Sequence, residues 1–190
     1  MLAVVGLGNP GREYEGTRHN AGYRVIEALA EKFSAGRPFR LSKSICAPAG
    51  YAGKKLLLVQ PVTYMNLSGQ AVVELFRQYR LLPGELLLIH DELDLPLGMI
   101  RFKSGGGSAG HQGVQSVIDC MGSPDFLRLR FGIGRPPGTM EAAAYVLQPF
   151  TPLEQTSVES TVGVAVEAVQ LLIRQGTAAA MNRFNQPLKP

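Results

Sequence analysis

Cysteine, histidine and long apolar runs are all scarce in this chain of 190 residues. The two cysteines, Cys46 and Cys120, are too few for a disulfide framework or a zinc site, and we expect both to be buried free thiols. No apolar run reaches the ~20 residues that a membrane helix needs. The first residues lack the basic segment that opens a signal peptide. We therefore expect a cytoplasmic protein that does not cross a membrane.

Charge is close to balanced, with a small basic excess. Lysine and arginine number 19 against 15 acidic residues, which gives a formal net charge of +4 and a pI near 9.2. One stretch contains only two acids, Asp119 and Asp125, and its cations are Arg101, Lys103, Arg128, Arg130 and Arg135. A basic face there suits a phosphate or a nucleic acid, although a solvated surface with salt bridges elsewhere is the alternative.

Apolar runs and helical periodicity alternate along the chain. Strand patterns are present at 2–5, 54–59, 86–89, 99–103 and 127–133. Helical patterns occupy 21–33, 66–79, 111–121 and 152–175, with Gly176 ending the last and a further turn or two at 178–184. This alternation predicts an α/β fold, a single domain over residues 1–190 with a mixed twisted sheet flanked by helices on both faces. In such folds the site lies beyond the carboxyl ends of strands.

Two short motifs fit known signatures but lack the context that those signatures need. Gly6–Gly11 fits the G-x-G-x-x-G loop of dinucleotide-binding proteins, yet residues 12–19 are polar and not helical, which favours a tight loop close to a substrate. Gly106–Gly110 fits the G-x-S-x-G turn of serine hydrolases, yet the only histidine after Ser108 is His111, which is too near to serve as its base. Neither a nicotinamide cofactor nor a serine nucleophile is the favoured interpretation.

Polar groups follow the strand at 86–89. The His90–Asp94 group, with three acids and a histidine, could hold a divalent metal, but strand alternation sends Asp91 to the opposite face from His90 and Glu92. A single acid that orients a distant histidine is the simpler interpretation. His19 could then act as a general base for water, with Asp91 fixing its tautomer. Asn9, Asn66 and the glycine-rich loop could donate hydrogen bonds to a carbonyl oxygen or its oxyanion.

Longer blocks match one family in order along the chain. They are VGLGNPG at 5–11, TRHNAG at 17–22, PVTYMNLSG at 61–69, HDELDLPLG at 90–98, KSGGG at 103–107, AGHQG at 109–113, RLRFGIGRP at 128–136 and MNRFN at 181–185. Together with Tyr14, these blocks resemble the signatures of bacterial-type peptidyl-tRNA hydrolases. The resemblance implies an enzyme that hydrolyses the ester between a peptide and the 3′ end of tRNA, and so recycles tRNA from prematurely released peptidyl-tRNA.

The resemblance also implies which residues carry out the reaction. By this match His19 is the general base that activates water, Asp91 holds His19 in its basic form, and Asn9 helps to distinguish N-blocked from free aminoacyl ends. Water, one base and a few amide donors suffice for an ester. The family match implies no metal and no organic cofactor, and it implies a monomer.

Further positions match residues that bind the substrate. Tyr14, Tyr64 and Asn66 correspond to positions that bind the end of the substrate, and Lys103 and Arg130 correspond to basic residues that hold the tRNA 5′-phosphate. Both cations belong to the basic stretch described above. The resemblance thus implies tRNA as the partner, bound in part through phosphate contacts that do not depend on base sequence, and no obligate protein partner.

One position departs from the family pattern. Gln112 stands where the family usually has an asparagine that helps to hold the substrate or the attacking water, and Ala109 replaces a glycine. Glutamine keeps the amide but adds a methylene, which can displace the amide by about 1 Å and cost up to ~10²-fold in rate. A non-catalytic RNA-binding homologue of the same fold is therefore the alternative. We expect residues 134–145 to border the cleft as a mobile lid.

Overall fold

The computed structural model describes residues 1–186, so the last four positions of the expected domain, 187–190, lie outside the described residues. Within that range the strands are β1 (Leu2–Gly6), β2 (Phe39–Leu41), β3 (Ser44–Tyr51), β4 (Lys54–Pro61), β5 (Leu86–Glu92), β6 (Ile100–Ser104) and β7 (Leu127–Gly132). The α-helices are α1 (Ala21–Lys32), α2 (Ser68–Tyr79), α3 (Gln112–Met121), α4 (Ala142–Val146) and α5 (Pro152–Phe184). Short 3₁₀ turns lie in the loops: η1 (Arg12–Tyr14), η2 (Arg18–Asn20), η3 (Met65–Leu67) and η4 (Pro83–Glu85).

The strands form one mixed sheet, as the sequence predicted, in the order β2-β3-β4-β1-β5-β7-β6. Strands β4, β1, β5 and β7 are parallel to their neighbours in this central run, whereas the pairs β2–β3, β3–β4 and β6–β7 are antiparallel. The carboxyl ends of the central parallel strands therefore meet at one edge of the sheet. The loops after β1 and β5 are brought together at that edge.

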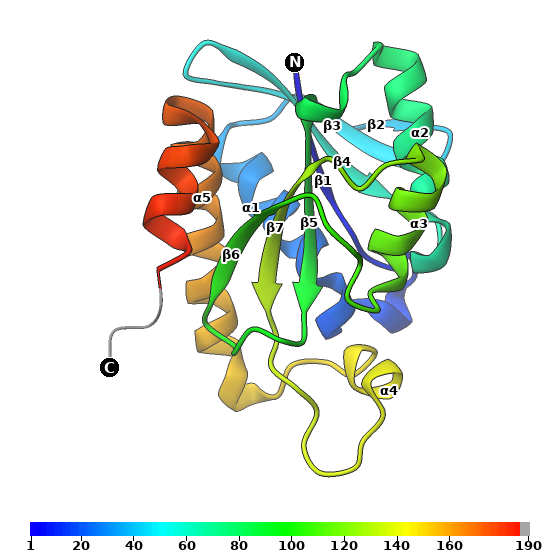
Figure 1. Ribbon diagram of the computed structural model, residues 1–190, viewed down its shortest axis with the longest axis vertical. Coiled ribbons are helices and arrows are strands. Elements are labelled where there is room, and N and C mark those ends of the chain that lie inside the picture. Colours follow the sequence, from blue (N-terminus) through cyan, green and yellow to red (C-terminus); the bar gives the residue numbers. More distant parts are fainter. Residues whose placement is uncertain (187–190) are drawn as a thin grey trace.

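Helices cover both faces of the sheet, which confirms the predicted fold class (Figure 1). Val4 and Ile89 belong to the buried cluster that includes α1 and α5, whereas Val5 and Leu88 belong to the cluster that includes α2 and α3. Successive residues of a strand point to opposite faces, so a strand buried on both sides needs apolar residues at every position. This requirement explains the continuous apolar runs from which β1 and β5 were predicted.

The predicted strands and helices are all present, with small differences at their ends. The elements that the sequence did not predict are β2 and β3, which form the exposed edge of the sheet, and the short helix α4. The predicted burial of both thiols is confirmed for Cys46 and wrong for Cys120, which is exposed. The buried positions of α3 end at Val117, and Cys120 lies in the last turn beyond them.

Helix α5 is long and apolar enough to cross a membrane by length and composition alone. Its inward-facing residues, among them Val158, Ala165 and Val169, are fully buried in the cluster shared with α1 and the sheet, as expected for a core helix. Gly176 has φ 85° and ψ 176° and is not helical. The helix end predicted at Gly176 is therefore confirmed: α5 consists of two helical segments that meet there, and the second contains the turns predicted at 178–184.

Candidate active site

A cavity of about 700 Å³ opens at the carboxyl edge of the sheet. Most of the residues that the sequence singled out line it, namely Asn9, His19, Tyr64, Asn66, Asp91 and Gln112. Tyr14 lies beside it, with its ring edge-on to Tyr64 at a centroid distance of 6.5 Å. Lys103 and Arg130 do not line the cavity. The fold therefore brings these six residues, which lie far apart along the chain, into one cavity.

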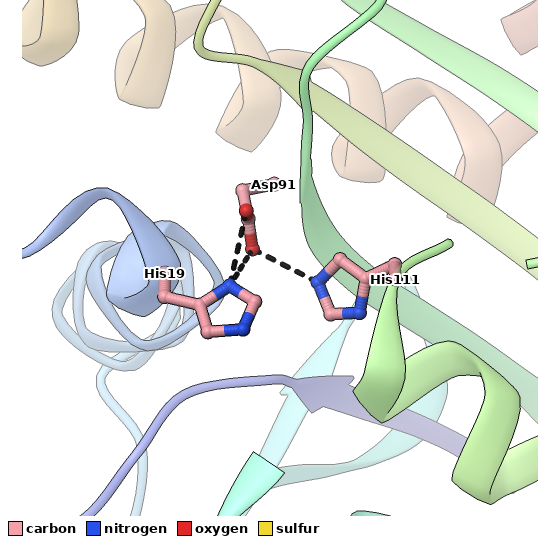
Figure 2. Close-up of side chains that lie close together, drawn as sticks. All are labelled: His19, Asp91 and His111. Carbon is pink, nitrogen blue, oxygen red and sulfur yellow. Dashed lines mark hydrogen bonds and ion pairs between the residues drawn. The ribbon is translucent and has the colours of Figure 1, made fainter. Parts of the chain in front are cut away.

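Two histidines converge on one buried carboxylate in this cavity (Figure 2). Asp91 lies on β5 and is 3% exposed. Nδ1 of His19, on η2, lies 2.9 Å from Oδ1 and 3.1 Å from Oδ2 of Asp91. Nε2 of His111 lies 2.9 Å from the same Oδ1. The predicted pairing of His19 with Asp91 is present in the geometry, and His111 is a third member.

Hydrogen bonds fix the tautomer of each imidazole. His111 is the N-cap of α3, and its Nδ1 accepts from the main-chain N–H groups of Gly113 at 3.1 Å and Val114 at 3.2 Å. The hydrogen of a neutral His111 must then be on Nε2, which donates it to Asp91. His19 donates its Nδ1–H to the same carboxylate, which leaves the Nε2 lone pair of His19 available to a molecule in the cavity.

The same three side chains, His19, Asp91 and His111, form a candidate metal cluster, with ligand atoms within 4.8 Å of one another. A metal on Nε2 of His111 would displace the hydrogen that its tautomer requires, because Nδ1 already accepts the hydrogen bonds of the helix cap. The donor set therefore suits hydrogen bonding better than metal binding. The other metal hypothesis, the His90–Asp94 group, is not supported, because among the described residues Asp91 converges with His19 and His111 instead. Glu92 and Asp94 form ion pairs with Arg130 and Arg135.

The electrostatics of the cavity centre on Asp91. Burial raises the pKa of Asp91, but the charges and hydrogen bonds of His19 and His111 outweigh burial and lower this pKa below its ordinary value. His90 is 1% exposed, and burial, with His111 nearby, lowers its pKa well below the ordinary value. The neutral His90 donates from Nδ1 to the main-chain oxygen of Asp91 at 2.7 Å, and its ring lies edge-on against His111. One negative charge is thus held between two imidazole donors.

Asn9 is fixed by contacts with two distant segments. The main-chain N–H of Asn9 donates to Oδ1 of Asn20 at 2.8 Å, and Nδ2 of Asn20 donates to the main-chain oxygen of Asn9 at 3.0 Å. Oδ1 of Asn9 accepts from the main-chain N–H of Met65 at 2.8 Å. Asn20 occupies the N-cap position of α1, but its side chain makes no cap hydrogen bond. The amide group of Asn9 left for a ligand is the Nδ2 donor.

The predicted basic face forms on the antiparallel pair of β6 and β7. Arg101 lies opposite Arg130, and Lys103 lies opposite Arg128. Because residues directly opposite each other point to the same side of a sheet, these cations share one face. Arg135 does not belong to it, since it is exposed and paired with Asp94. The prediction is confirmed for Arg101, Lys103 and Arg130, which are partly exposed, whereas Arg128 shares this side of the sheet but is buried.

A glycine-rich loop joins this basic face to the cavity. Arg128 is 2% exposed, and its guanidinium donates to the main-chain oxygens of three successive glycines, Gly105, Gly106 and Gly107. Burial, and then the neighbouring charge of Arg130, lowers the pKa of Arg128. Arg128 is therefore a structural support of the loop rather than a free cation.

The two predicted phosphate-binding cations lie on either side of this support. A Cβ at Gly106 would lie 3.2 Å from Nζ of Lys103, so Lys103 lies against the loop. Nε of Arg130 donates to Oε2 of Glu92 at 2.7 Å, and Glu92 lines the cavity. One nitrogen of the Arg130 guanidinium is thus used in an ion pair with Glu92, so Lys103 is the more available of the two cations.

The segment predicted to border the cleft, residues 134–145, does so at 141–143, and the wall continues beyond it at Val146 and Leu147. Helix α4 and its neighbours supply one wall of the cavity through Ala142, Ala143, Val146 and Leu147, and Glu141 precedes them. The motion of this segment stays a prediction. His111 was not selected as a site residue, because it was weighed only as the base of Ser108, whose hydroxyl instead donates to Gln115. The sequence did contain a signal for His111: this histidine begins a predicted helix, directly after a strand end and a glycine-rich loop.

Fold and cavity together define an α/β protein with a histidine–aspartate pair at the carboxyl edge of a mixed sheet. The profile of the family described as peptidyl-tRNA hydrolase matches residues 3–190. A relative named peptidyl-tRNA hydrolase from Chloroflexus aurantiacus is 45% identical over 187 residues, which cover 97% of this chain and 99% of the relative. Another from Nocardia farcinica is 46% identical and covers 96% of this chain and 95% of its own length. The chain therefore belongs to the peptidyl-tRNA hydrolase family.

Solved structures give the same result. The peptidyl-tRNA hydrolase of Acinetobacter baumannii superposes with a TM-score of 0.91 at 38% identity, covering 97% of this chain and 94% of that one. The 5′-methylthioadenosine nucleosidase of Arabidopsis thaliana matches with a TM-score of 0.55 at 8% identity, a likeness of fold alone. The expected family and fold class are confirmed.

Proposed function

We propose that this chain hydrolyses the ester that joins a peptide to the 3′ end of tRNA, and thereby recycles tRNA from prematurely released peptidyl-tRNA. The observation that carries the proposal is the 2.9 Å contact between His19 and Asp91 inside a cavity of about 700 Å³. Family membership supports the substrate class. The tautomer of His19 supplies a free lone pair, which is what a general base needs.

Water is the nucleophile in this mechanism. Nε2 of His19 accepts a proton from water as the water oxygen attacks the ester carbonyl, and Asp91 stabilises the imidazolium that forms. The tetrahedral intermediate then expels the 3′-oxygen of the terminal ribose, which takes the proton back from His19. The products are a peptide carboxylate and a tRNA with a free 3′-hydroxyl. His111 keeps Asp91 in place by donating to the oxygen that His19 also uses.

Amide donors around the cavity stabilise the negative charge on the carbonyl oxygen. Asn9 offers Nδ2, because its oxygen is taken by Met65. Asn66 and Gln112 add amides from η3 and the start of α3, and both are exposed at the cavity. Tyr64, 57% exposed, and Tyr14 provide aromatic surface at the rim for the end of the substrate. Each of these donors acts most strongly on the oxyanion, which carries more charge than the ground-state carbonyl.

The test of this function compares N-blocked with unblocked aminoacyl-tRNA, using the wild type and His19→Ala. We expect release of tRNA from the blocked substrate only, and a fall of about 10²- to 10⁴-fold in His19→Ala, the range that a general base contributes. Binding of tRNA by His19→Ala stays close to that of the wild type. An equal loss of binding and turnover would remove His19 from the role of base.

Lys103 and Arg130 hold the 5′-phosphate of tRNA in this proposal. The double variant Lys103→Ala with Arg130→Ala should weaken tRNA binding and lower the slope of log K against log salt by roughly 1 to 2. The matched control is Lys54→Ala with Lys55→Ala, which removes two exposed cations at the amino end of β4, away from the carboxyl edge. A salt slope that is unchanged, or changed equally in the control, would place the phosphate elsewhere.

The alternative function, binding of RNA without turnover, rests on Gln112 alone. It predicts a folded wild type that binds tRNA and releases nothing from N-blocked aminoacyl-tRNA. Gln112→Asn, which shortens the side chain by one methylene, would then restore turnover. If the wild type is active, Gln112→Asn should change its rate by no more than ~10²-fold, the cost of a displacement of about 1 Å.

We also propose that residues 1–190 act as a single domain, as a monomer in the cytoplasm, without a cofactor. The family profile spans nearly the whole of this range, which supports a single functional unit. Sedimentation of the purified chain with and without tRNA measures the oligomeric state. A dimer that persists at catalytic concentrations would contradict the monomer.

A further inference from the structure

Arg18 directly precedes His19, yet its side chain is buried. It is 4% exposed, and its guanidinium carbon lies 4.3 Å from the ring centroid of Tyr145 and 5.2 Å from that of Phe150. Tyr145 belongs to α4, and Phe150 lies just before α5. A planar cation between aromatic rings is held in one orientation by packing as well as by charge.

Every contact of this guanidinium leads to the chain that leaves α4. Nη1 donates to the main-chain oxygens of Pro149 at 2.6 Å and Gln148 at 3.3 Å. Nη2 donates to both carboxylate oxygens of Glu154, at 2.7 and 3.0 Å. Glu154 lies in the first turn of α5. A single side chain thus connects the segment that bears His19 to the end of α4 and the beginning of α5.

The main chain reinforces the same connection. The N–H of Arg18 donates to the oxygen of Gln148 at 3.0 Å, Thr17 forms an isolated bridge with Pro149, and the N–H of Phe150 donates to the oxygen of Gly16 at 3.3 Å. Two segments separated by about 130 positions therefore pair as a short ribbon. This ribbon joins the residues that follow α4 to the residues at the start of the turn that carries His19.

We infer that Arg18 is a positioning residue that couples α4, the apolar wall of the cavity, to the alignment of His19. The inference rests on the proposed function for its catalytic readout. The guanidinium fork reaches a carboxylate and two carbonyls at once, which a lysine ammonium cannot do from one position. Without the fork, α4 and η2 are no longer held at a fixed separation, and a displacement of about 1 Å of a catalytic group can cost ~10²-fold in rate.

The decisive comparison is Arg18→Lys against Arg24→Lys. Arg24 is a matched control because it also lies over Phe150, at 5.5 Å, and also reaches α5, through Gln155 at 3.3 Å, but this hydrogen bond does not involve the chain between α4 and α5. We expect Arg18→Lys to lower kcat about 10- to 100-fold with unchanged affinity for tRNA, and Arg24→Lys to leave kcat unchanged. Glu154→Gln, which keeps the shape of the partner, should lower kcat in the same direction.

Hydrogen exchange supplies a readout that does not depend on activity. In Arg18→Lys, exchange should accelerate in residues 142–150 while the amides of β1 and β5 keep the protection of the wild type. Equal kcat in Arg18→Lys and Arg24→Lys would overturn the coupling. A loss of protection throughout the sheet would also overturn the coupling, because it would indicate general destabilisation of the protein. An inactive wild type with faster exchange at 142–150 in Arg18→Lys would instead contradict the proposed function and leave the structural coupling supported.

Discussion

Replacing Asp91 with asparagine tests the centre of the site with the smallest change of shape. In the wild type one oxygen, Oδ1, accepts from His19 and His111, each at 2.9 Å, and Oδ2 lies 3.1 Å from Nδ1 of His19. Asparagine can keep an oxygen at the shared position. Its NH₂ group then occupies the place of Oδ2 and opposes the Nδ1–H of His19. The variant therefore loses a charge and gains a donor where an acceptor was.

Two effects determine the magnitude of the loss. A hydrogen bond to a charged group contributes about 1.5–3 kcal/mol. Because about 1.4 kcal/mol corresponds to a factor of ten in rate, loss of the charge alone lowers turnover about 10- to 100-fold. The NH₂ group also favours the His19 tautomer with hydrogen on Nε2, which cannot accept a proton from water. In Ser-His-Asp enzymes the comparable change to asparagine costs ~10⁴-fold. We expect a loss of about 10²- to 10⁴-fold.

The assay is single-turnover hydrolysis of an N-blocked aminoacyl-tRNA from about pH 5 to about pH 9, the range in which histidines titrate. Because the pKa of Asp91 is lowered in the folded protein, its carboxylate is charged throughout this range. Asparagine removes that charge, so both the rate and its dependence on pH should change. Asp94→Asn, at a nearby exposed acid, is the control. An unchanged rate and profile in Asp91→Asn would refute the reasoning.

The remaining predictions concern packing and thiol exposure. A Cβ at Gly69 would lie 2.0 Å from the main-chain oxygen of Ser116, so Gly69→Ala should push α2 from α3 and lower stability by at least about 1–3 kcal/mol, as measured by urea unfolding. The control is Gly163→Ala on α5, where no atom lies within 4 Å of the new Cβ; it should raise stability by about 0.5–1 kcal/mol. Equal effects of the two changes would show that the contact with Ser116 does not limit the packing of α2 on α3. Cys120 is exposed and should react with a thiol reagent in the native protein. Cys46 should react only after unfolding, because it is buried and burial raises the pKa of its thiol to about 11. Reaction of both thiols in the native state would show that the sheet opens around Cys46.

The central strands and long helices could be predicted because their burial is reflected in the type of each residue. β1 and β5 are buried on both faces, so their apolar runs are continuous. β3 offers no such signal, because most of its residues are small, only part of it is buried, and it contains Pro48. Its strand conformation depends on the eight-residue ladder with β4, which is a tertiary contact. Helix α4 spans only five residues, too few for a helical period to be visible.

The sequence predicted which residues belong to the candidate site better than it predicted the hydrogen bonds between them. Asp91 follows a buried strand, and His19 and Asn9 fall in glycine-containing loops, so residue type and position favoured them. The role of His111 depends on a contact with Asp91 across 20 positions of sequence and on a cap at the start of α3. Asn20 has the sequence context of a helix cap, but the long-range contact with Asn9 takes its side chain. Such competition between local and distant partners is not visible in one sequence.

The turn η2 explains how a base on a loop can be held as firmly as one on a strand. Its three residues bind three different parts of the molecule: Arg18 binds the chain between α4 and α5, His19 binds β5 through Asp91, and Asn20 binds the loop after β1. Arg18 and Asn20 are buried, so the neighbours of His19 on both sides are fixed by packing as well as by hydrogen bonds. The orientation of His19 is thus set before substrate arrives, and the ordering of its loop does not oppose the chemical step. If His19 is the base, as proposed, the same arrangement should make the rate of hydrolysis depend on Arg18 and Asn20 as well as on the residues that line the cavity.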